Sequence, residues 1–325
     1  MIEYTPEHIM AWTRMGMRKA FGPMLEQLAA DHPDVVVLAA DVASSANLGG
    51  YQERFPDRFF NIGIAEQNMT AIAAGLAQDG YNVFITSFSP FVSMRAYEAV
   101  RTVVGYTHQN VKVVALGSGM TLGSQGNTHY GLEDISLMKT IPGMRVLSPA
   151  DCVEEAKVLE DLAAYPGPAY LRLTGIDGTP GVHKGDYAYQ PGVPELLKDG
   201  DDIVFLGTGA VLHECMRVSR AFRKEALTCA VYDIASLKPL DLSTLAPKLL
   251  QAKLIVTVEE HFQTGGLGDS VAAWLATRRE HPPLCKIGIP DTFPHPGDYA
   301  YMLEQCGLTA AKIKPTVFAA LADQQ

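Results

Sequence analysis

Short runs of apolar, mostly β-branched residues alternate along the chain with longer stretches whose apolar positions recur at helical spacing. The run Val35–Ala40 lies between polar turns, which is typical of a strand buried on both faces. The stretch from Ala65 to Ala77 predicts a helix, and Val83–Phe88 predicts the next strand. Strands that alternate with helices indicate an α/β fold with parallel sheets covered by helices on both faces. By the same criteria we expect further helices over residues 9–28, 91–106, 133–140, 153–164, 210–224, 242–250, 268–279, 298–306 and 309–321, and further strands over residues 111–116, 144–147, 169–174, 203–206, 229–234, 254–259 and 284–287.

The alternation breaks between Gly175 and Pro194, where Gly, Pro, Asp and Tyr dominate and no periodicity is visible. A segment of this kind is typical of an interdomain linker. We therefore expect a first domain over residues 1–178, a linker over 179–194 and a second domain over 195–325. Each domain is predicted to hold a mostly parallel sheet flanked by helices.

Hydrophobic residues make up 47% of the 325 residues and charged residues 19%, which indicates folded domains rather than a disordered chain. The net charge of -10, with no cluster of Lys or Arg, argues against nucleic acid or an anionic membrane as a partner. No apolar run reaches the roughly 20 residues that span a bilayer, and the N-terminus does not read as a secretory signal. The five cysteines are scattered without metal-ligand spacing, so no metal site or disulfide framework is predicted and a reducing cytoplasm is expected.

Three motifs carry candidate chemistry. The first is Asn61-Ile-Gly-Ile-Ala-Glu66-Gln-Asn, which places an acid in the first turn of a helix. Alone, this pattern indicates only a favourable helix start. The second contains Phe88 and Phe91, which are three residues apart and could share one face or simply pack in the core. The third is a glycine-rich loop that ends in Gly-Asn-Thr-His129, and its histidine could serve catalysis or bond to the backbone.

In this order, the motifs resemble the pyrimidine-binding domain of thiamine-diphosphate enzymes in the transketolase and deoxyxylulose-phosphate synthase branch. The resemblance runs from about Arg18 to Arg172, and more weakly through the second domain. It implies that Glu66 hydrogen-bonds to the cofactor's aminopyrimidine and favours the imino tautomer needed to activate the thiazolium carbon. It also implies that Phe91 and Phe88 stack on the pyrimidine, and that His129 contacts substrate oxygens and moves protons.

The resemblance assigns further residues to cofactor and substrate. Asp41 and Val42 match positions at the cofactor and subunit interface, although Asp41 could instead cap a turn. Gln125 stands where family members have an aspartate that reads a sugar hydroxyl, and a histidine that helps to hold the acceptor's phosphate is replaced by glycine. These departures favour a non-standard anionic or modified sugar. The family residues that hold a sugar phosphate match Arg18, Ser45 and Arg172, each of which could also be an ordinary surface or interface residue.

The family's Mg²⁺ site for the cofactor diphosphate, a Gly-Asp-Gly motif, does not occur in this sequence. The resemblance therefore implies a separate N-terminal partner subunit that carries the Mg²⁺ and diphosphate site, in an α2β2 heterotetramer. The implied activity is the transfer of a two-carbon ketol unit from a ketose to an aldehyde. Three alternatives stay open: the β subunit of a 2-oxoacid dehydrogenase, a noncatalytic regulatory subunit, and a deoxyxylulose-phosphate synthase.

Overall fold

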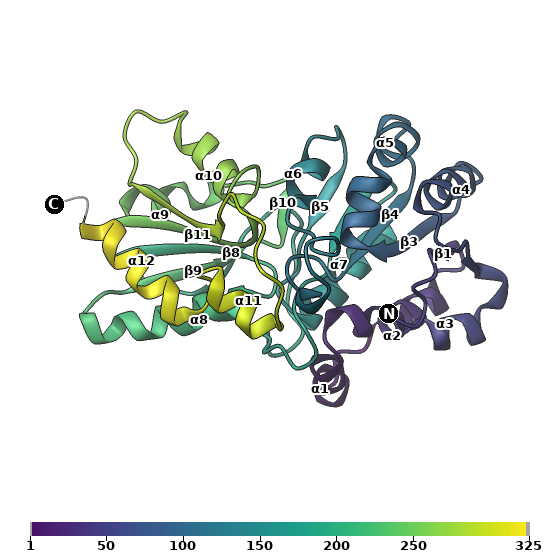
Figure 1. Cartoon of the computed structure of the whole chain (residues 1–325), viewed down its shortest axis with the longest axis horizontal. Helices are drawn as coiled ribbons and strands as arrows, with labels where there is room; N and C mark the ends of the chain where they lie inside the picture. Colours follow the sequence, from purple (N-terminus) through teal and green to yellow (C-terminus); the bar gives the residue numbers. More distant parts are fainter. Residues whose placement is uncertain (1, 323–325) are drawn as a thin grey trace.

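The computed structural model describes residues 2–322, in which two sheets lie side by side, each between layers of helices (Figure 1). The first sheet has the order β10-β5-β6-β4-β3-β1-β2 and the second has the order β12-β11-β8-β9-β7. Neighbouring strands are parallel except for one edge strand in each sheet, β10 and β7. This arrangement confirms the predicted fold class. The strands are β1 (Val35–Ala39), β2 (Phe59–Asn61), β3 (Asn82–Phe88), β4 (Val111–Leu116), β5 (Arg145–Leu147), β6 (Ala169–Arg172), β7 (Glu195–Lys198), β8 (Ile203–Thr208), β9 (Cys229–Asp233), β10 (Ser236–Lys238), β11 (Leu254–Phe262) and β12 (Leu284–Ile289).

Helices cover both faces of the first sheet. Successive residues of a strand point to opposite faces, and both sets are apolar in β1, so each face packs against helices. Val36 of β1 lies in the same apolar cluster as Met69 of α4, whereas Val37 lies in the cluster of Leu25 of α2 and Leu159 of α7. The helices are α1 (Pro6–Met15), α2 (Met17–Asp31), α3 (Gly49–Arg54), α4 (Glu66–Gln78), α5 (Tyr97–Ala99), α6 (Asp134–Lys139), α7 (Cys152–Ala164), α8 (Leu212–Ala221), α9 (Ala246–Gln251), α10 (Leu267–Leu275), α11 (Tyr299–Gln305) and α12 (Ala310–Ala322).

The structure departs from the predicted elements at two helices. The helix expected over residues 9–28 is two helices, α1 and α2, separated at Gly16, whose φ is 70°. A side chain at Gly16 would come within 2.9 Å of the Ile176 backbone, so this break needs glycine. The helix expected over residues 91–106 contains two π-helical segments, η2 (Phe91–Arg95) and η3 (Val100–Tyr106), on either side of α5.

The strand β10 links the two halves of the chain. It follows β9 of the second sheet in sequence, yet it pairs with β5 at the edge of the first sheet. The sequence did not predict this strand, and the domain limits at 178 and 195 stay predictions. No helix within residues 2–322 is both long enough and apolar enough to cross a membrane.

Candidate active site

The predicted cofactor residues gather at the carboxyl end of the first sheet. Asp41 follows β1, Glu66 follows β2, Phe88 ends β3, and the loop that carries His129 follows β4. In open α/β sheets, the carboxyl ends of parallel strands form the usual ligand-binding edge. Strand order therefore brings together four segments that are far apart in sequence.

Glu66 is a buried carboxylate at the start of α4, with 2% of the residue exposed. The Arg95 Nη1 lies 3.2 Å from its Oε2 and 3.3 Å from its Oε1, and the Ser87 hydroxyl donates to Oε1 over 3.4 Å. A buried carboxylate needs such partners, because desolvation without them is costly. Glu66 is thus held as a buried hydrogen-bond acceptor at the start of α4.

Phe88, Phe91 and His129 form one aromatic group beside this carboxylate. The ring centroids of Phe91 and His129 are 5.4 Å apart, and Phe88 lies 6.2 Å from His129 and 6.3 Å from Phe91. The Arg95 guanidinium carbon lies 4.3 Å from the centre of the Phe91 ring, which connects the aromatic group to Glu66. The Thr128 hydroxyl is 3.0 Å from Nδ1 of His129. All three rings are partly exposed, so a flat ligand can reach their faces.

Asp41 is exposed and sits in a left-handed turn, with φ of 58°, while Val42 beside it is buried. Asn61 holds this turn: its Oδ1 accepts from the Asp41 and Gly63 backbone N–H groups, each over 3.1 Å, and its Nδ2 donates to the Asp41 carboxylate over 3.3 Å. Asn61 therefore ties the end of β1 to the turn that leads to Glu66.

The predicted phosphate residues do not all lie together. Arg18 on α2 and Ser45 are neighbours, because the Arg18 guanidinium donates to the Ser45 carbonyl over 3.4 Å. Gln125 is exposed on the short helix η4 (Gly123–Gln125).

Arg172 lies elsewhere, fully buried where the two halves of the chain meet. Its Nε is 2.9 and 3.1 Å from the Asp134 carboxylate oxygens, and its Nη2 donates to the carbonyls of Gly131 and Glu260. Burial raises the pKa of the Glu260 carboxyl in the same region. The structure thus does not bring Arg172 to the exposed edge where the other predicted residues gather.

The sequence reasoning missed Arg95 and Ser87, the two partners of Glu66, and the bridging role of Asn61. A signal for Arg95 was present, since it lies four residues after Phe91, the spacing at which a cation can meet a ring on one helix face. Ser87 points toward Glu66 only through tertiary contact, which no local pattern reveals.

Comparison with known proteins gives matches along both halves. The family model described as transketolase, pyrimidine binding domain, matches residues 13–177, and that described as transketolase, C-terminal domain, matches residues 192–313. One of the subunits of the apulose-4-phosphate transketolase of Phocaeicola vulgatus is 34% identical over 284 residues, 87% of this chain and 90% of the relative. The 6-deoxy-6-sulfo-D-fructose transketolase subunit of a Clostridium species is 31% identical, over 91% of this chain and 92% of the relative. A solved split-gene transketolase, in the form of an inactive β4 tetramer, aligns with a TM-score of 0.86 and 35% identity over 95% of this chain and 98% of its own.

Proposed function

The chain belongs to the transketolase family, and we propose that it forms the pyrimidine-binding half of a two-chain active site that a separate N-terminal subunit completes. It is a subunit of a transketolase-type enzyme, which uses thiamine diphosphate to transfer a two-carbon ketol unit from a ketose to an aldehyde. The similarity to transketolase subunits along nearly the whole chain favours this function over a 2-oxoacid dehydrogenase subunit. The observation that carries the proposal is the buried Glu66 carboxylate beside an accessible aromatic group.

The residues present fit one end of thiamine diphosphate. The Glu66 carboxylate is a buried acceptor for a protonated ring nitrogen, and the faces of Phe91 and Phe88 suit a flat heteroaromatic ring. We assign Asp41 and Val42 to the border of the same ring, and the support is that Asn61 ties the Asp41 turn to the turn that leads to Glu66. When bound, the cofactor supplies the carbanion chemistry that the protein's own side chains lack. Glu66 would hydrogen-bond to the ring and hold its orientation, and His129 would exchange protons with substrate oxygens.

The other end of the cofactor needs a cation and donors for its diphosphate. The Gly-Asp-Gly motif of the family is absent from the sequence. We propose that a partner subunit binds the diphosphate through Mg²⁺, and that two copies of each chain form an α2β2 heterotetramer with two-fold symmetry. The five free cysteines support the expected cytoplasmic setting.

We propose a sugar substrate that carries an anionic group. Two relatives act on sugars whose names include a phosphate and a sulfo group, respectively. Arg18 lies beside Ser45, where its guanidinium contacts the Ser45 carbonyl. A guanidinium and a hydroxyl in neighbouring residues suit either anion. Gln125 has an uncharged amide where family members carry an acid, so it can donate to a sugar substituent as well as accept from it.

The test is reconstitution of the purified chain with its N-terminal subunit, thiamine diphosphate and Mg²⁺, followed by assay of ketol transfer to aldehyde acceptors. We expect activity only from the pair. Glu66→Gln should lower kcat of the pair by about 100-fold or more, because an amide cannot take up or release a proton as the carboxyl group does. Glu53→Gln, at an exposed glutamate of α3, is the matched control and should be as active as the wild type.

Circular dichroism of each variant separates loss of chemistry from loss of fold. Full turnover by the isolated chain would reject the two-chain site. Normal turnover by the folded Glu66→Gln pair would reject the role of Glu66.

A further inference from the structure

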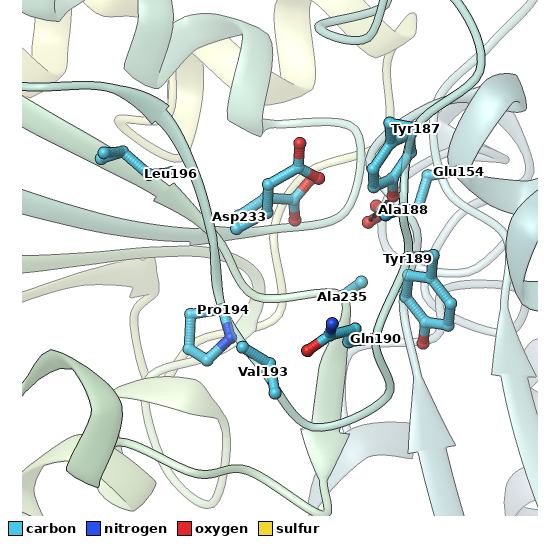
Figure 2. Close-up of a pocket in the computed structure, with 11 residues that line it drawn as sticks. Glu154, Tyr187, Ala188, Tyr189, Gln190, Val193, Pro194, Leu196, Asp233 and Ala235 are labelled. Atoms are coloured by element: carbon cyan, nitrogen blue, oxygen red, sulfur yellow. Dashed lines mark hydrogen bonds between the residues drawn. The ribbon is translucent and has the colours of Figure 1, made fainter.

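A cavity of about 250 Å³ lies at the junction of the two domains, and none of the candidate active-site residues lines it. Figure 2 shows Glu154, Tyr187, Tyr189 and Asp233 around this space. Glu154 comes from α7 of the first domain, the tyrosines from the connecting segment, and Asp233 from the end of β9 in the second sheet. Three parts of the chain therefore contribute polar groups to one cavity.

Asp233 is the residue that indicates a ligand. Only 1% of it is exposed, it lines the cavity, and neither of its carboxylate oxygens has a hydrogen-bond partner. A buried carboxylate without donors is costly and calls for a cation. Within residues 2–322, the one basic side chain within ion-pair distance of Asp233 is His183, with Nε2 3.9 Å from Oδ2.

His183 is held in the orientation of a metal ligand. The Asp151 Oδ2 lies 3.1 Å from Nδ1 and also accepts from the backbone N–H of His183 over 2.8 Å, while the ring stacks on Tyr187 at 4.4 Å. A carboxylate that fixes Nδ1–H leaves Nε2 as the coordinating atom, the usual arrangement around metal-bound histidines. Nε2 faces Asp233 and Glu195, whose Oε2 is 3.0 Å away.

The backbone explains why these groups meet. Glu195 of β7 is the direct cross-strand partner of Asp233 of β9, so their side chains share one face of the sheet. Asp151 is the N-cap of α7 and places Glu154 one turn along the helix, next to the same space. Ligand atoms of Glu154, His183 and Asp233 all lie within 4.8 Å of one another.

We propose that His183, Asp233 and Glu154, with Glu195 as a fourth donor, bind a divalent transition-metal ion such as Zn²⁺ that fastens the two domains together. One imidazole nitrogen and several carboxylate oxygens suit Zn²⁺ better than Mg²⁺, which prefers oxygen ligands alone. Zinc bonds of about 2.0–2.2 Å require ligand atoms no more than about 4.2 Å apart, so the widest pair must approach by under an ångström. The site is separate from the Mg²⁺ proposed for the cofactor, and its role is structural.

The experiment uses the full chain, stripped with a chelator and titrated with ZnCl2 by calorimetry and with CoCl2 by visible absorption. We expect one Zn²⁺ per chain, a higher Tm with the ion, and much weaker binding of Mg²⁺. His183→Gln and Asp233→Asn should each weaken Zn²⁺ binding by at least about 10-fold and change the Co²⁺ spectrum. His281→Gln, at an exposed histidine, is the control for surface binding and should change neither.

Absence of stoichiometric Zn²⁺ binding to the wild type would overturn the proposal, and this measurement needs no variant. Equal loss of affinity in His281→Gln, or none in His183→Gln and Asp233→Asn, would also overturn it. If either buried-site variant fails to fold, Glu195→Gln at the partly exposed rim supplies the same test. None of these measurements depends on transketolase activity.

Discussion

At the scale of single residues, Arg95 makes two contacts that a cofactor ring would also use. The Glu66 carboxylate is bound by Arg95, and the same guanidinium lies over the Phe91 ring. A ring that hydrogen-bonds to Glu66 and stacks on Phe91 therefore competes with Arg95 for both contacts. Half of the Arg95 side chain is exposed, so it has room to move aside.

His261 shows how burial sets a charge state in the second sheet. It is fully buried, with Nδ1 2.7 Å from the Phe262 carbonyl and Nε2 accepting from the Ser136 backbone N–H over 3.4 Å. Burial lowers the pKa of His261 to about 4. The folded protein thus keeps this imidazole neutral under conditions that protonate it in the unfolded chain.

A pH-dependent loss of stability follows from His261. Because its pKa falls from 6.5 in the unfolded chain to about 4, its contribution is intact above pH 6.5 and is lost as the pH falls toward 4. The full effect is about 3 kcal/mol. Thermal unfolding of the wild type and His261→Gln at several pH values measures it. The variant should lose less stability between pH 6.5 and 4, and parallel losses would contradict the assignment.

At the scale of elements, helix α2 and the segment after β1 approach each other closely enough to place Arg18 beside Ser45. The approach depends on Gly22, whose backbone N–H donates to the Ala46 carbonyl over 3.1 Å. A Cβ on Gly22 would lie 2.0 Å from the Asn47 carbonyl oxygen. The Asn47 carbonyl belongs to the backbone and cannot rotate away as a flexible side chain can, so a larger residue at position 22 would force the helix and the loop apart.

Gly22→Ala should therefore destabilise the protein by about 1–3 kcal/mol, since the helix must move away from the loop. Gly75→Ala in α4 is the matched control, because a Cβ there meets no atom within 4 Å. It should stabilise the helix by up to about 1 kcal/mol. Urea unfolding of both variants compares them directly, and a stabilising effect of Gly22→Ala would show that the close approach is not needed.

The elements that the sequence predicted are helices long enough to show a period and strands with an apolar, mostly β-branched run. The long helix α4 and the strand β3 were predicted within about a residue at each end. The strands β2, β7 and β10 were missed, because they contain no β-branched residue and their pairing depends on distant partners. The helix α3 was missed, because six residues are too few to show a helical period. In the candidate site, the motif around Glu66 was readable, whereas Arg95 and Ser87 reach Glu66 only after folding.

At the scale of the whole molecule, the two domains are joined by buried polar groups as well as by apolar packing. Arg172 spans the junction, with Asp134 and the Gly131 carbonyl on one side and the Glu260 carbonyl on the other. The Tyr170 hydroxyl also donates to Asp134 over 2.8 Å. The Arg172 Nη1 atom is buried without a hydrogen-bond partner, so the charge of Arg172 depends on these few contacts. Loss of one member is costly, since it leaves a charge unpaired in the interior.

Arg172→Met should lower the free energy of unfolding by about 3–5 kcal/mol, because it leaves Asp134 buried without its counter-ion. Lys312→Met, at an exposed ion pair with Glu304, should change it by less than about 1 kcal/mol. Denaturant unfolding of both variants checks this, together with KM of the reconstituted pair. Unchanged stability with a raised KM would instead assign Arg172 to substrate binding.

The crossing of β10 into the first sheet also has a consequence for biosynthesis. Until residues 236–238 leave the ribosome, β5 has a bare edge whose backbone groups can pair with any extended segment nearby. A chain truncated at the linker would lack β10, so the edge of β5 would stay unpaired. Although the sequence divides into two domains, the first of them is completed only after the second has been translated as far as β10.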